Sequence, residues 1–167
     1  RDGRQREFAV AAEEAGFYQV QAQGVGAGDR YHYRLDGELV PDPASRFQPE
    51  GPFGPSEVVD PSLYRWTDTA WRGLPLMGQV LYEMHLGSFT SAGTWKSAEE
   101  KLDYLKDLGV TMLEIMPVTE FVGSKSWGYG TIDPYAPESS YGTPDEMKHF
   151  IDQAHARGLG VMLDIVH

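Results

Sequence analysis

Short stretches of alternating hydrophobic and polar residues dominate the start of the chain. Residues 17–23 (FYQVQAQ) and 31–40 (YHYRLDGELV) carry aromatic and aliphatic side chains at every second position, close to Gly and Asp. A period of two places alternate side chains on opposite faces of a strand, and the Asp36-Gly37 pair is typical of a hairpin turn. The pattern therefore predicts antiparallel strands, and helix signals are nearly absent before residue 78.

A proline-rich segment follows at residues 41–56 (PDPASRFQPEGPFGPS). Its prolines lack the backbone N–H that a helix interior or a central strand requires, so neither element can continue through it. Two interpretations remain open, a long ordered loop and a flexible linker. Arg46, Phe47 and Phe53 favour the ordered loop, because such side chains are costly in a purely disordered spacer.

From residue 78 onward the pattern changes to an alternation of strands and helices. Residues 79–87 (QVLYEMHLG) form a mostly apolar run of strand length, and residues 110–118 (VTMLEIMPV) form a second one. Between them, residues 97–109 predict a helix that begins with a capping box made by Ser97 and Glu100. The buried stripe of this helix is predicted at Leu102, Leu105 and Leu108, and its end at Gly109.

A second helix is predicted with clear signals at both ends. Thr143 is the expected N-cap, with Pro144 as the first helical residue and Glu146 completing a capping box. The helix should stop at Gly158, and its apolar face consists of Met147, Phe150, Ile151 and Ala154. Residues 161–166 (VMLDIV) then predict a third strand that is apolar enough to be buried on both faces.

The alternation of strands and helices predicts an α/β fold with a parallel sheet, either open or closed into a barrel. We accordingly divide the chain into residues 1–77, an antiparallel module with its proline-rich connecting segment, and residues 78–167, the parallel part. In both kinds of parallel fold the reactive groups collect where the strands end on their C-terminal side. Candidate residues are therefore expected at those ends and in the loops that follow them.

Composition narrows the class of partner. The chain has 167 residues, of which 41% are hydrophobic, and a formal net charge of −11, which is unfavourable for binding nucleic acid or anionic membranes. No apolar run reaches the roughly 18 to 20 residues that a membrane span requires, and the first residues lack the apolar stretch of a signal peptide. We therefore expect a cytoplasmic protein with no nucleic-acid or membrane partner, although a targeting segment can precede Arg1. Without cysteine, the chain has neither a disulfide nor a thiolate nucleophile.

The loop after the second strand, residues 119–142, is rich in aromatic residues among polar neighbours. These are Trp127, Tyr129, Tyr135 and Tyr141. Such rings are suited to stacking on the apolar faces of sugars while polar groups bond the hydroxyls. Tyr129 is flanked by glycines that permit a close backbone approach to a ligand, but it can also be a structural anchor. No glycine-rich phosphate motif follows any predicted strand, so nucleotide-binding folds are disfavoured.

Three carboxylates lie in the predicted strands of the parallel part. Asp164 is near the C-terminal end of the third strand, where an unpaired buried carboxylate would be costly. It is therefore either part of a site or one half of a core salt bridge. Glu83 and Glu114 occupy comparable strands, and Glu114 can also point into the helix layer.

The histidines give no metal signal. His85, His155 and His167 do not show the spacing of zinc ligands, so no metal site is expected. His155 fits the polar face of its predicted helix.

The segments YEMHLGSF, GVTMLEIMPV, WGYGTIDPYAPESSYGTPDE and GLGVMLDIVH together resemble the opening of the catalytic barrel in the α-amylase superfamily of glycoside hydrolases. DIVH is similar to the start of that superfamily's first signature, an aspartate followed after three residues by Asn-His, and the Asn-His pair lies past residue 167. The resemblance covers most of residues 30–167. It implies the opening three strand-helix units of a (β/α)8 TIM barrel, preceded in residues 1–77 by an antiparallel, immunoglobulin-like β-sandwich.

The resemblance also implies roles for individual residues. Tyr129 matches the tyrosine that stacks against the sugar at the cleavage subsite, and Trp127 would form a wall of the same pocket. Asp133 and Asp164 match aspartates that shape the site without reacting. The family's nucleophilic aspartate, general-acid glutamate and third carboxylate follow later strands, so we expect no catalytic residue in this chain. The retaining mechanism requires no metal and no cofactor.

Finer motifs point to a subfamily. Residues 41–73 resemble the segment that joins the sandwich to the barrel in malto-oligosyltrehalose trehalohydrolases, which cleave the α-1,4 linkage next to the terminal trehalose of maltooligosyl trehalose. Glycogen branching enzymes, which act on α-glucan, share the Tyr-Glu-x-His-Leu-Gly-Ser stretch and the WGY loop. We expect the N-terminal part of such a hydrolase, inactive as an isolated piece. The alternatives are a branching enzyme and a non-catalytic carbohydrate-binding homologue.

Overall fold

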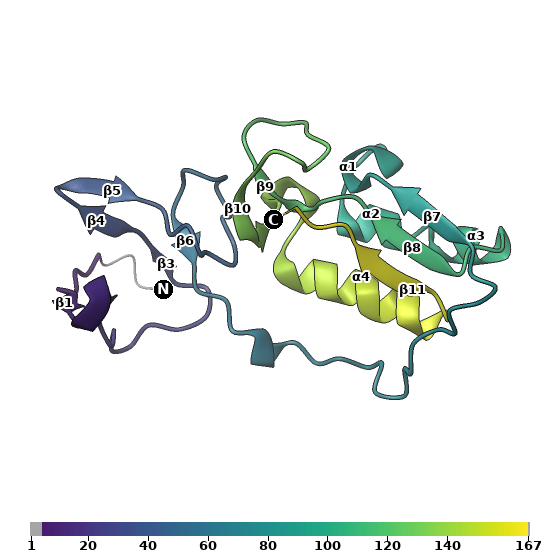
Figure 1. Cartoon of the computed structure of the whole chain (residues 1–167), viewed down its shortest axis with the longest axis horizontal. Coiled ribbons are helices and arrows are strands. Elements are labelled where there is room, and N and C mark those ends of the chain that lie inside the picture. The colour runs from purple at the N-terminus through teal and green to yellow at the C-terminus, as the bar shows by residue number, and fades with distance from the viewer. Residues whose placement is uncertain (1–4, 167) are drawn as a thin grey trace.

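The computed structural model describes residues 5–166 (Figure 1). Its parallel sheet consists of β7 (Leu81–Met84), β8 (Met112–Ile115) and β11 (Gly160–Leu163), in the spatial order β11-β8-β7. Both neighbouring pairs run parallel, which confirms the α/β fold predicted after residue 78. His167 and residues 1–4 lie outside the described part of the chain.

Four α-helices belong to the described residues: α1 (Leu86–Phe89), α2 (Trp95–Glu99), α3 (Leu102–Asp107) and α4 (Pro144–Ala156). Side chains from the strands and helices form one hydrophobic core. Leu113 and Ile115 of β8 are fully buried in it, together with Leu102 and Leu105 of α3 and Phe150 of α4. Burying these side chains ties the helices to one face of the sheet.

The predicted helix at residues 97–109 differs from the observed one at its start. The capping box is formed by Thr94 and Ser97, not by Ser97 and Glu100. The Thr94 hydroxyl accepts a bond of 3.3 Å from the Ser97 N–H, and the Ser97 hydroxyl accepts one of 3.2 Å from the Thr94 N–H. Trp95 thereby becomes the first helical residue, and its burial at 1% exposure accounts for the earlier start.

The far end of that helical region also departs from the prediction. Leu102 and Leu105 are fully buried as expected, but Leu108 is 60% exposed. Gly109, with φ 96°, directly follows Leu108 in the left-handed conformation predicted for the end of the helix. The last residue of the predicted stripe therefore points to solvent.

The predicted signals of α4 are confirmed. The Glu146 N–H donates to the Thr143 hydroxyl at 3.2 Å, and the Glu146 carboxylate accepts from the Thr143 N–H at 2.8 Å. Pro144 is the first helical residue, and Gly158 follows the end of the helix with φ 79°. Phe150 and Ala154 are buried, and Met147 and Ile151 pack against the core.

The third strand is shorter and more exposed than predicted. Its ladder ends at Leu163, and Met162 and Leu163 are 38% and 37% exposed. The expectation that both faces of this strand are buried is wrong for these residues, because β11 lies at the edge of the sheet.

The aromatic loop at residues 119–142 contains a hairpin that the sequence did not predict. Strands β9 (Thr119–Phe121) and β10 (Thr131–Pro137) pair antiparallel, and the 3₁₀ helix η3 (Ser139–Tyr141) follows. The register shifts on both sides of Asp133. Residues 122–130 form the tip of this hairpin and include Trp127 and Tyr129.

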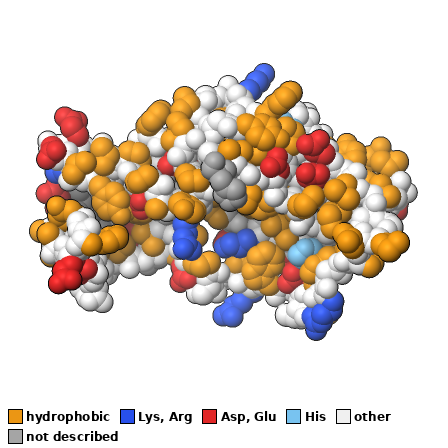
Figure 2. Space-filling model, viewed as in Figure 1, with side chains coloured by type: hydrophobic (Ala, Val, Ile, Leu, Met, Phe, Trp, Pro, Cys, Tyr) orange, Lys and Arg blue, Asp and Glu red, His pale blue; other side chains and the backbone are white. Residues whose placement is uncertain are grey.

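The first part of the chain holds short antiparallel pairs. The pairs are β1 (Ala11–Ala12) with β2 (Tyr18–Gln19), β3 (Arg30–Tyr31) with β6 (Ser56–Glu57), and β4 (Tyr33–Leu35) with β5 (Glu38–Val40); η1 (Glu14–Gly16) lies between β1 and β2. The hairpin turn predicted at Asp36-Gly37 is confirmed, with φ of 49° and 90°. Figure 2 shows hydrophobic side chains spread over one face of the whole molecule, including this region.

The proline-rich segment is an ordered loop. Phe47 is 7% exposed and Gln48 is fully buried, and the Gln48 amide donates to the carbonyl oxygens of Pro52 and Gly54. Arg46 and Phe53, which also favoured this interpretation, are exposed. The loop leads into η2 (Pro61–Leu63) and then along α4 (Figure 1).

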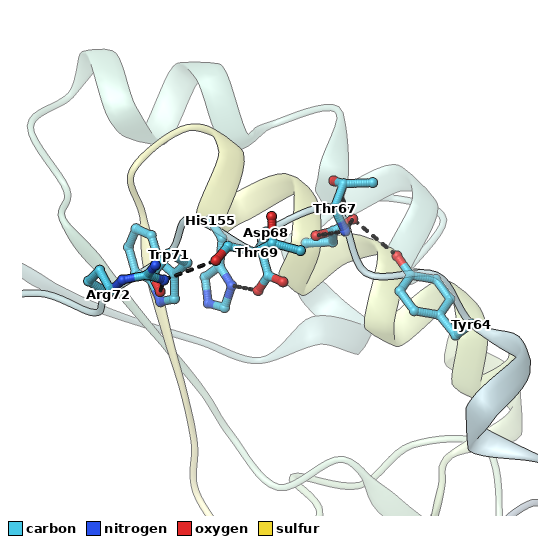
Figure 3. A network of polar contacts seen from close by, with 8 residues as sticks. Tyr64, Thr67, Asp68, Thr69, Trp71, Arg72 and His155 are labelled. Atoms are coloured by element: carbon cyan, nitrogen blue, oxygen red, sulfur yellow. Dashed lines mark hydrogen bonds and ion pairs between the residues drawn. The ribbon is translucent and has the colours of Figure 1, made fainter.

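The connecting segment is held against α4 by two groups on that helix (Figure 3). Asp152 is 1% exposed and accepts bonds from the Thr67 N–H at 3.0 Å and from the Thr67 hydroxyl at 2.8 Å. His155 stacks on Trp71 with ring centroids 4.4 Å apart, and its Nδ1 lies 2.7 Å from the Asp68 carboxylate. His155 has a polar partner, as expected on the polar face of its helix, but the connecting segment packs over its ring.

Candidate functional site

The C-terminal ends of the three parallel strands carry the candidate residues. His85 directly follows β7, Pro117 lies just after β8, and Asp164 directly follows β11. The Asp164 N–H donates to the carbonyl oxygen of Ile115 at 2.9 Å, beside Leu163 and Ile115, the last pair of the β11–β8 ladder. Asp164 is thereby held beside the C-terminal end of β8. Parallel α/β folds carry their reactive groups at this edge of the sheet.

Tyr129 and Asp164, two of the predicted site residues, are in direct contact. The Tyr129 hydroxyl donates a hydrogen bond of 2.8 Å to Oδ2 of Asp164. This bond, slight desolvation and the charges of Asp164, Glu83 and Glu114 all raise the pKa of Tyr129, so the hydroxyl keeps its proton. Among residues 5–166, Asp164 has the Tyr129 hydroxyl as its side-chain partner and no salt-bridge cation. The Tyr129 side chain remains 49% exposed and accessible to a ligand.

Glu83, Glu114 and Asp164 lie on one face of the sheet. Glu83 pairs with Glu114, Glu114 pairs with Met162, and Asp164 is two residues beyond Met162. Because successive side chains of a strand alternate, this face is opposite the one on which buried Leu113 packs against the helices. The alternative in which Glu114 points into the helix layer is therefore wrong.

The loop that carries Tyr129 lies against the end of β8. Gly128 is buried with φ 86°, and a Cβ at this position would lie 2.0 Å from the Pro117 carbonyl oxygen. The Gly128 N–H donates to the Ser126 hydroxyl at 3.0 Å. Gly128 is therefore needed for a close approach to the protein's own backbone, rather than to a ligand.

The other aromatic residues of the loop divide into two groups. Trp127, the second predicted substrate-binding residue, is 71% exposed, and Tyr135 is 68% exposed. Tyr141 is 4% exposed, with its hydroxyl 3.2 Å from Nε2 of His85. Tyr141 is therefore a core residue, and its predicted place among sugar-stacking rings is wrong.

Asp133, the remaining predicted site residue, lies on β10 opposite Glu120 of β9. It is 2% exposed, and its Oδ2 has no hydrogen-bond partner among the described residues. Burial, and then the charge of Asp42 in the connecting segment, raise the pKa of Asp133. Within residues 5–166, no polar contact joins Asp133 to Tyr129 or Asp164, so Asp133 belongs to the base of the hairpin.

Glu120 is the most perturbed carboxyl group at that base. It is 1% exposed and accepts a 2.9 Å hydrogen bond from the Ser139 N–H. Burial raises the pKa of Glu120 to about 7, with smaller contributions in the same direction from Glu138 and Asp133. The bond from Ser139 opposes this rise.

Residues 5–166 contain no group of three or more His, Cys, Asp or Glu side chains placed to hold a metal ion. His85 and His155 have other partners: His85 bonds to the Ser126 carbonyl oxygen, and His155 bonds to the Asp68 carboxylate. Within the same residues, no helix combines the length and the apolar character that crossing a bilayer requires.

His85 is a residue of this region that the sequence reasoning missed. Its Nε2 lies 2.7 Å from the Ser126 carbonyl oxygen, in the loop that carries Tyr129. The spacing of histidines along the sequence can indicate a metal site, but it does not indicate a contact with a distant loop. The strand-end argument applied to Asp164 would have found His85, because both residues directly follow a parallel strand.

The family described as "Alpha amylase, catalytic domain" matches residues 55–167. The chain belongs to this family. The matched region contains all three parallel strands together with Tyr129 and Asp164. The resemblance to glycoside hydrolases of the α-amylase family is thereby confirmed.

Two kinds of enzyme are among the relatives of this chain. The malto-oligosyltrehalose trehalohydrolase of Deinococcus radiodurans is 45% identical over 161 residues, which are 96% of this chain and 27% of that protein. A 1,4-alpha-glucan branching enzyme of Pseudoalteromonas atlantica is 36% identical over 171 residues, covering 90% of this chain and 24% of that protein. The chain therefore spans about a quarter of the length of these relatives.

Solved structures support the same fold. A putative α-amylase from Salmonella typhimurium is 50% identical with a TM-score of 0.91, over 93% of this chain and 27% of that one. The GBS pullulanase SAP, solved in complex with maltotetraose, is 25% identical with a TM-score of 0.59, over 76% of this chain and 23% of that one. The arrangement of strands and helices is thus that of an α-amylase catalytic domain.

Proposed function

We propose that this chain is the part of a malto-oligosyltrehalose trehalohydrolase that builds one wall of its substrate pocket. The complete protein would hydrolyse the α-1,4 linkage next to the terminal trehalose of maltooligosyl trehalose and release trehalose. The observation that carries this proposal is the 45% identity, over 96% of the chain, to a protein of that name. The bond between Tyr129 and Asp164 at the strand ends supports the pocket wall.

Four residues of the chain serve this pocket in the proposal. Tyr129 stacks its ring on the glucose unit at the cleaved bond, and Trp127 forms the adjoining wall. Asp164 holds the Tyr129 hydroxyl and so fixes the direction of the ring. Asp133 lies on the hairpin that carries both aromatic residues, and its part in shaping the site rests on the resemblance to the family.

The reaction is retaining glycoside hydrolysis. It needs two carboxyl groups about 5 to 5.5 Å apart, one that attacks the anomeric carbon and one that protonates the departing oxygen. We assign neither role to a residue of this chain and place both on later strands of the complete protein. Glu83, Glu114 and Asp164 contribute a negative field that favours the positive charge developing on the sugar ring in the transition state.

We further propose that the parallel sheet opens a closed (β/α)8 barrel. Support comes from its two faces, one packed against helices and the other carrying Glu83 and Glu114, as expected of a barrel interior. Residues 1–77 would then be an antiparallel, immunoglobulin-like β-sandwich module with its connecting segment. The short antiparallel pairs between β1 and β6 support this division.

A branching enzyme acting on α-glucan is the second candidate. It is favoured by the relative of that name at 36% identity over 90% of the chain. A non-catalytic carbohydrate-binding homologue is distinguished from both by replacement of the carboxylates at the later strand ends.

The proposal is tested by expressing the complete reading frame and incubating the protein with maltotriosyl trehalose. We expect trehalose among the products. A matched reaction with maltotetraose, which lacks the trehalose end, controls for general α-glucan hydrolysis. New α-1,6 branches without trehalose would identify a branching enzyme, and binding without either product would identify a carbohydrate-binding protein.

A further inference from the structure

The ring of His85 is fixed on three sides at the end of β7. Its Nε2 lies 2.7 Å from the Ser126 carbonyl oxygen and 3.2 Å from the Tyr141 hydroxyl, and its Nδ1 lies 2.9 Å from the Ser88 hydroxyl. A Cβ added at Gly87 would lie 2.8 Å from the Tyr141 ring and 3.1 Å from the His85 ring. The histidine therefore occupies a site shaped to hold it in one orientation.

The partners determine where the proton sits on the neutral ring. A carbonyl oxygen can only accept, so Nε2 of His85 carries the hydrogen and donates it to Ser126. Nδ1 then accepts from the Ser88 hydroxyl. The Tyr141 hydroxyl contributes a second, longer contact to the same N–H.

The bond to Ser126 reaches Tyr129 through the intervening backbone. The Ser126 carbonyl is held by His85, and the Ser126 hydroxyl accepts from the Gly128 N–H. Gly128 is in turn pressed against the Pro117 carbonyl, and Tyr129 is the next residue. His85 thereby links the end of β7 to Tyr129, the loop residue whose hydroxyl bonds to Asp164 at the end of β11.

We propose that His85 is a positioning residue for Tyr129, acting through the hydrogen bond from Nε2 to the Ser126 carbonyl. Its role rests on the proposed function, because it matters for activity only if Tyr129 lines the substrate pocket. It does not touch the sugar. It fixes the backbone from which the Tyr129 ring reaches both Asp164 and the ligand.

Two substitutions in the complete protein separate this role from general stability. In His85→Gln the side-chain amide can reach the place of Nε2 and donate to Ser126, whereas in His85→Asn the shorter side chain reaches only the place of Nδ1. We expect His85→Gln to keep kcat/KM within about threefold of wild type and His85→Asn to lose about tenfold to a hundredfold, the scale of a misplaced pocket residue. His149→Asn, the same change at an exposed histidine of α4, is the control.

The decisive measurement adds Tyr129→Ala to each variant. If His85 acts through Tyr129, His85→Asn should cause no further loss of kcat/KM in the Tyr129→Ala background. An equal loss in both backgrounds would overturn the proposal, as would full activity of His85→Asn.

A second readout is independent of activity. Lys125 is exposed and directly precedes Ser126, so trypsin cleavage after Lys125 reports how firmly the loop is held. We expect faster cleavage there in His85→Asn than in wild type or His85→Gln. Equal cleavage rates in all three would overturn the role of His85. Faster cleavage, combined with unchanged activity of Tyr129→Ala, would instead show that the loop is held by His85 and that the proposed role of Tyr129 in the pocket is wrong.

Discussion

The hydroxyl of Tyr129 donates a 2.8 Å hydrogen bond to the carboxylate of Asp164. It joins the tip of the β9–β10 hairpin to the end of β11, between residues 35 positions apart. The bond holds the ring by its hydroxyl and leaves about half of the side chain exposed. A ring fixed at one end and open elsewhere is suited to stacking on a sugar.

The backbone at Gly128 is expected to be the most sensitive point of this arrangement. In Gly128→Ala the new Cβ would overlap the Pro117 carbonyl oxygen at 2.0 Å, and the residue would keep a φ of 86° that favours glycine. We expect a loss of activity of at least about tenfold through displacement of Tyr129. Steady-state kinetics on the complete protein measures it.

Gly130→Ala is the matched control for that experiment. Gly130 flanks Tyr129 on the other side, its Cβ would meet nothing within 4 Å, and its φ is not in the left-handed region. Its activity should stay close to wild type. Equal losses in the two variants would show that the close approach at Gly128 is not what fixes the loop.

The anchorage of the connecting segment gives a prediction about stability. Asp152→Ala removes the buried acceptor of the Thr67 N–H and hydroxyl, so the free energy of unfolding should fall by about 1–3 kcal/mol. Asp103→Ala, which breaks an exposed ion pair with Arg157, should cost less than about 1 kcal/mol. Urea titration of the two variants in parallel provides the comparison, and similar losses would mean that Asp152 does not hold the segment.

Features set by neighbouring residues along the chain could be predicted from the sequence. The capping box of Thr143 and Glu146 depends on two residues within one helical turn, and the structure forms it as predicted. The turn at Asp36-Gly37 is equally local. The three parallel strands followed from apolar runs separated by helix signals, and the sheet has all three.

Features set by distant partners could not be predicted in this way. The sequence predicts one capping box, at Ser97 and Glu100, but the burial of Trp95 in the core starts the helix earlier, with the box at Thr94 and Ser97. Tyr141 is an aromatic residue of a polar loop, which predicts stacking on a ligand, but packing beside His85 buries it. The covering of His155 by Trp71 joins residues 84 positions apart in sequence, and no local pattern reports it.

Glu120 should give the protein a measurable pH dependence. Its pKa of about 7 in the folded state lies above the ordinary 4.5, so the folded protein binds this proton more tightly than the unfolded chain does. The sign follows: the contribution of Glu120 to stability is fully present below the unfolded pKa and is lost as the pH rises through about 7. The stability of the folded protein should therefore fall as the pH rises from 4.5 to about 7.

Glu120→Gln isolates that contribution. The glutamine is neutral and can still accept the bond from the Ser139 N–H, so its thermal midpoint should exceed that of wild type at about pH 8 and match it at about pH 5. Glu100→Gln, at an exposed position of the helical region, should have the thermal midpoint of wild type at both pH values. A constant difference between Glu120→Gln and wild type at both pH values would contradict the raised pKa.

The most direct test of the pocket is trehalose release by Tyr129 variants of the complete protein. Tyr129→Phe keeps the ring and loses the bond to Asp164, which should lower kcat/KM by about tenfold, the scale of a hydrogen bond to a charged group. Tyr129→Ala removes the ring as well and should lower it by at least about a hundredfold, because both the stacking surface and its anchor are lost. This order, wild type above phenylalanine above alanine, is the result expected here. Undiminished trehalose release by Tyr129→Ala would contradict the assignment of Tyr129 and Asp164 to the substrate pocket.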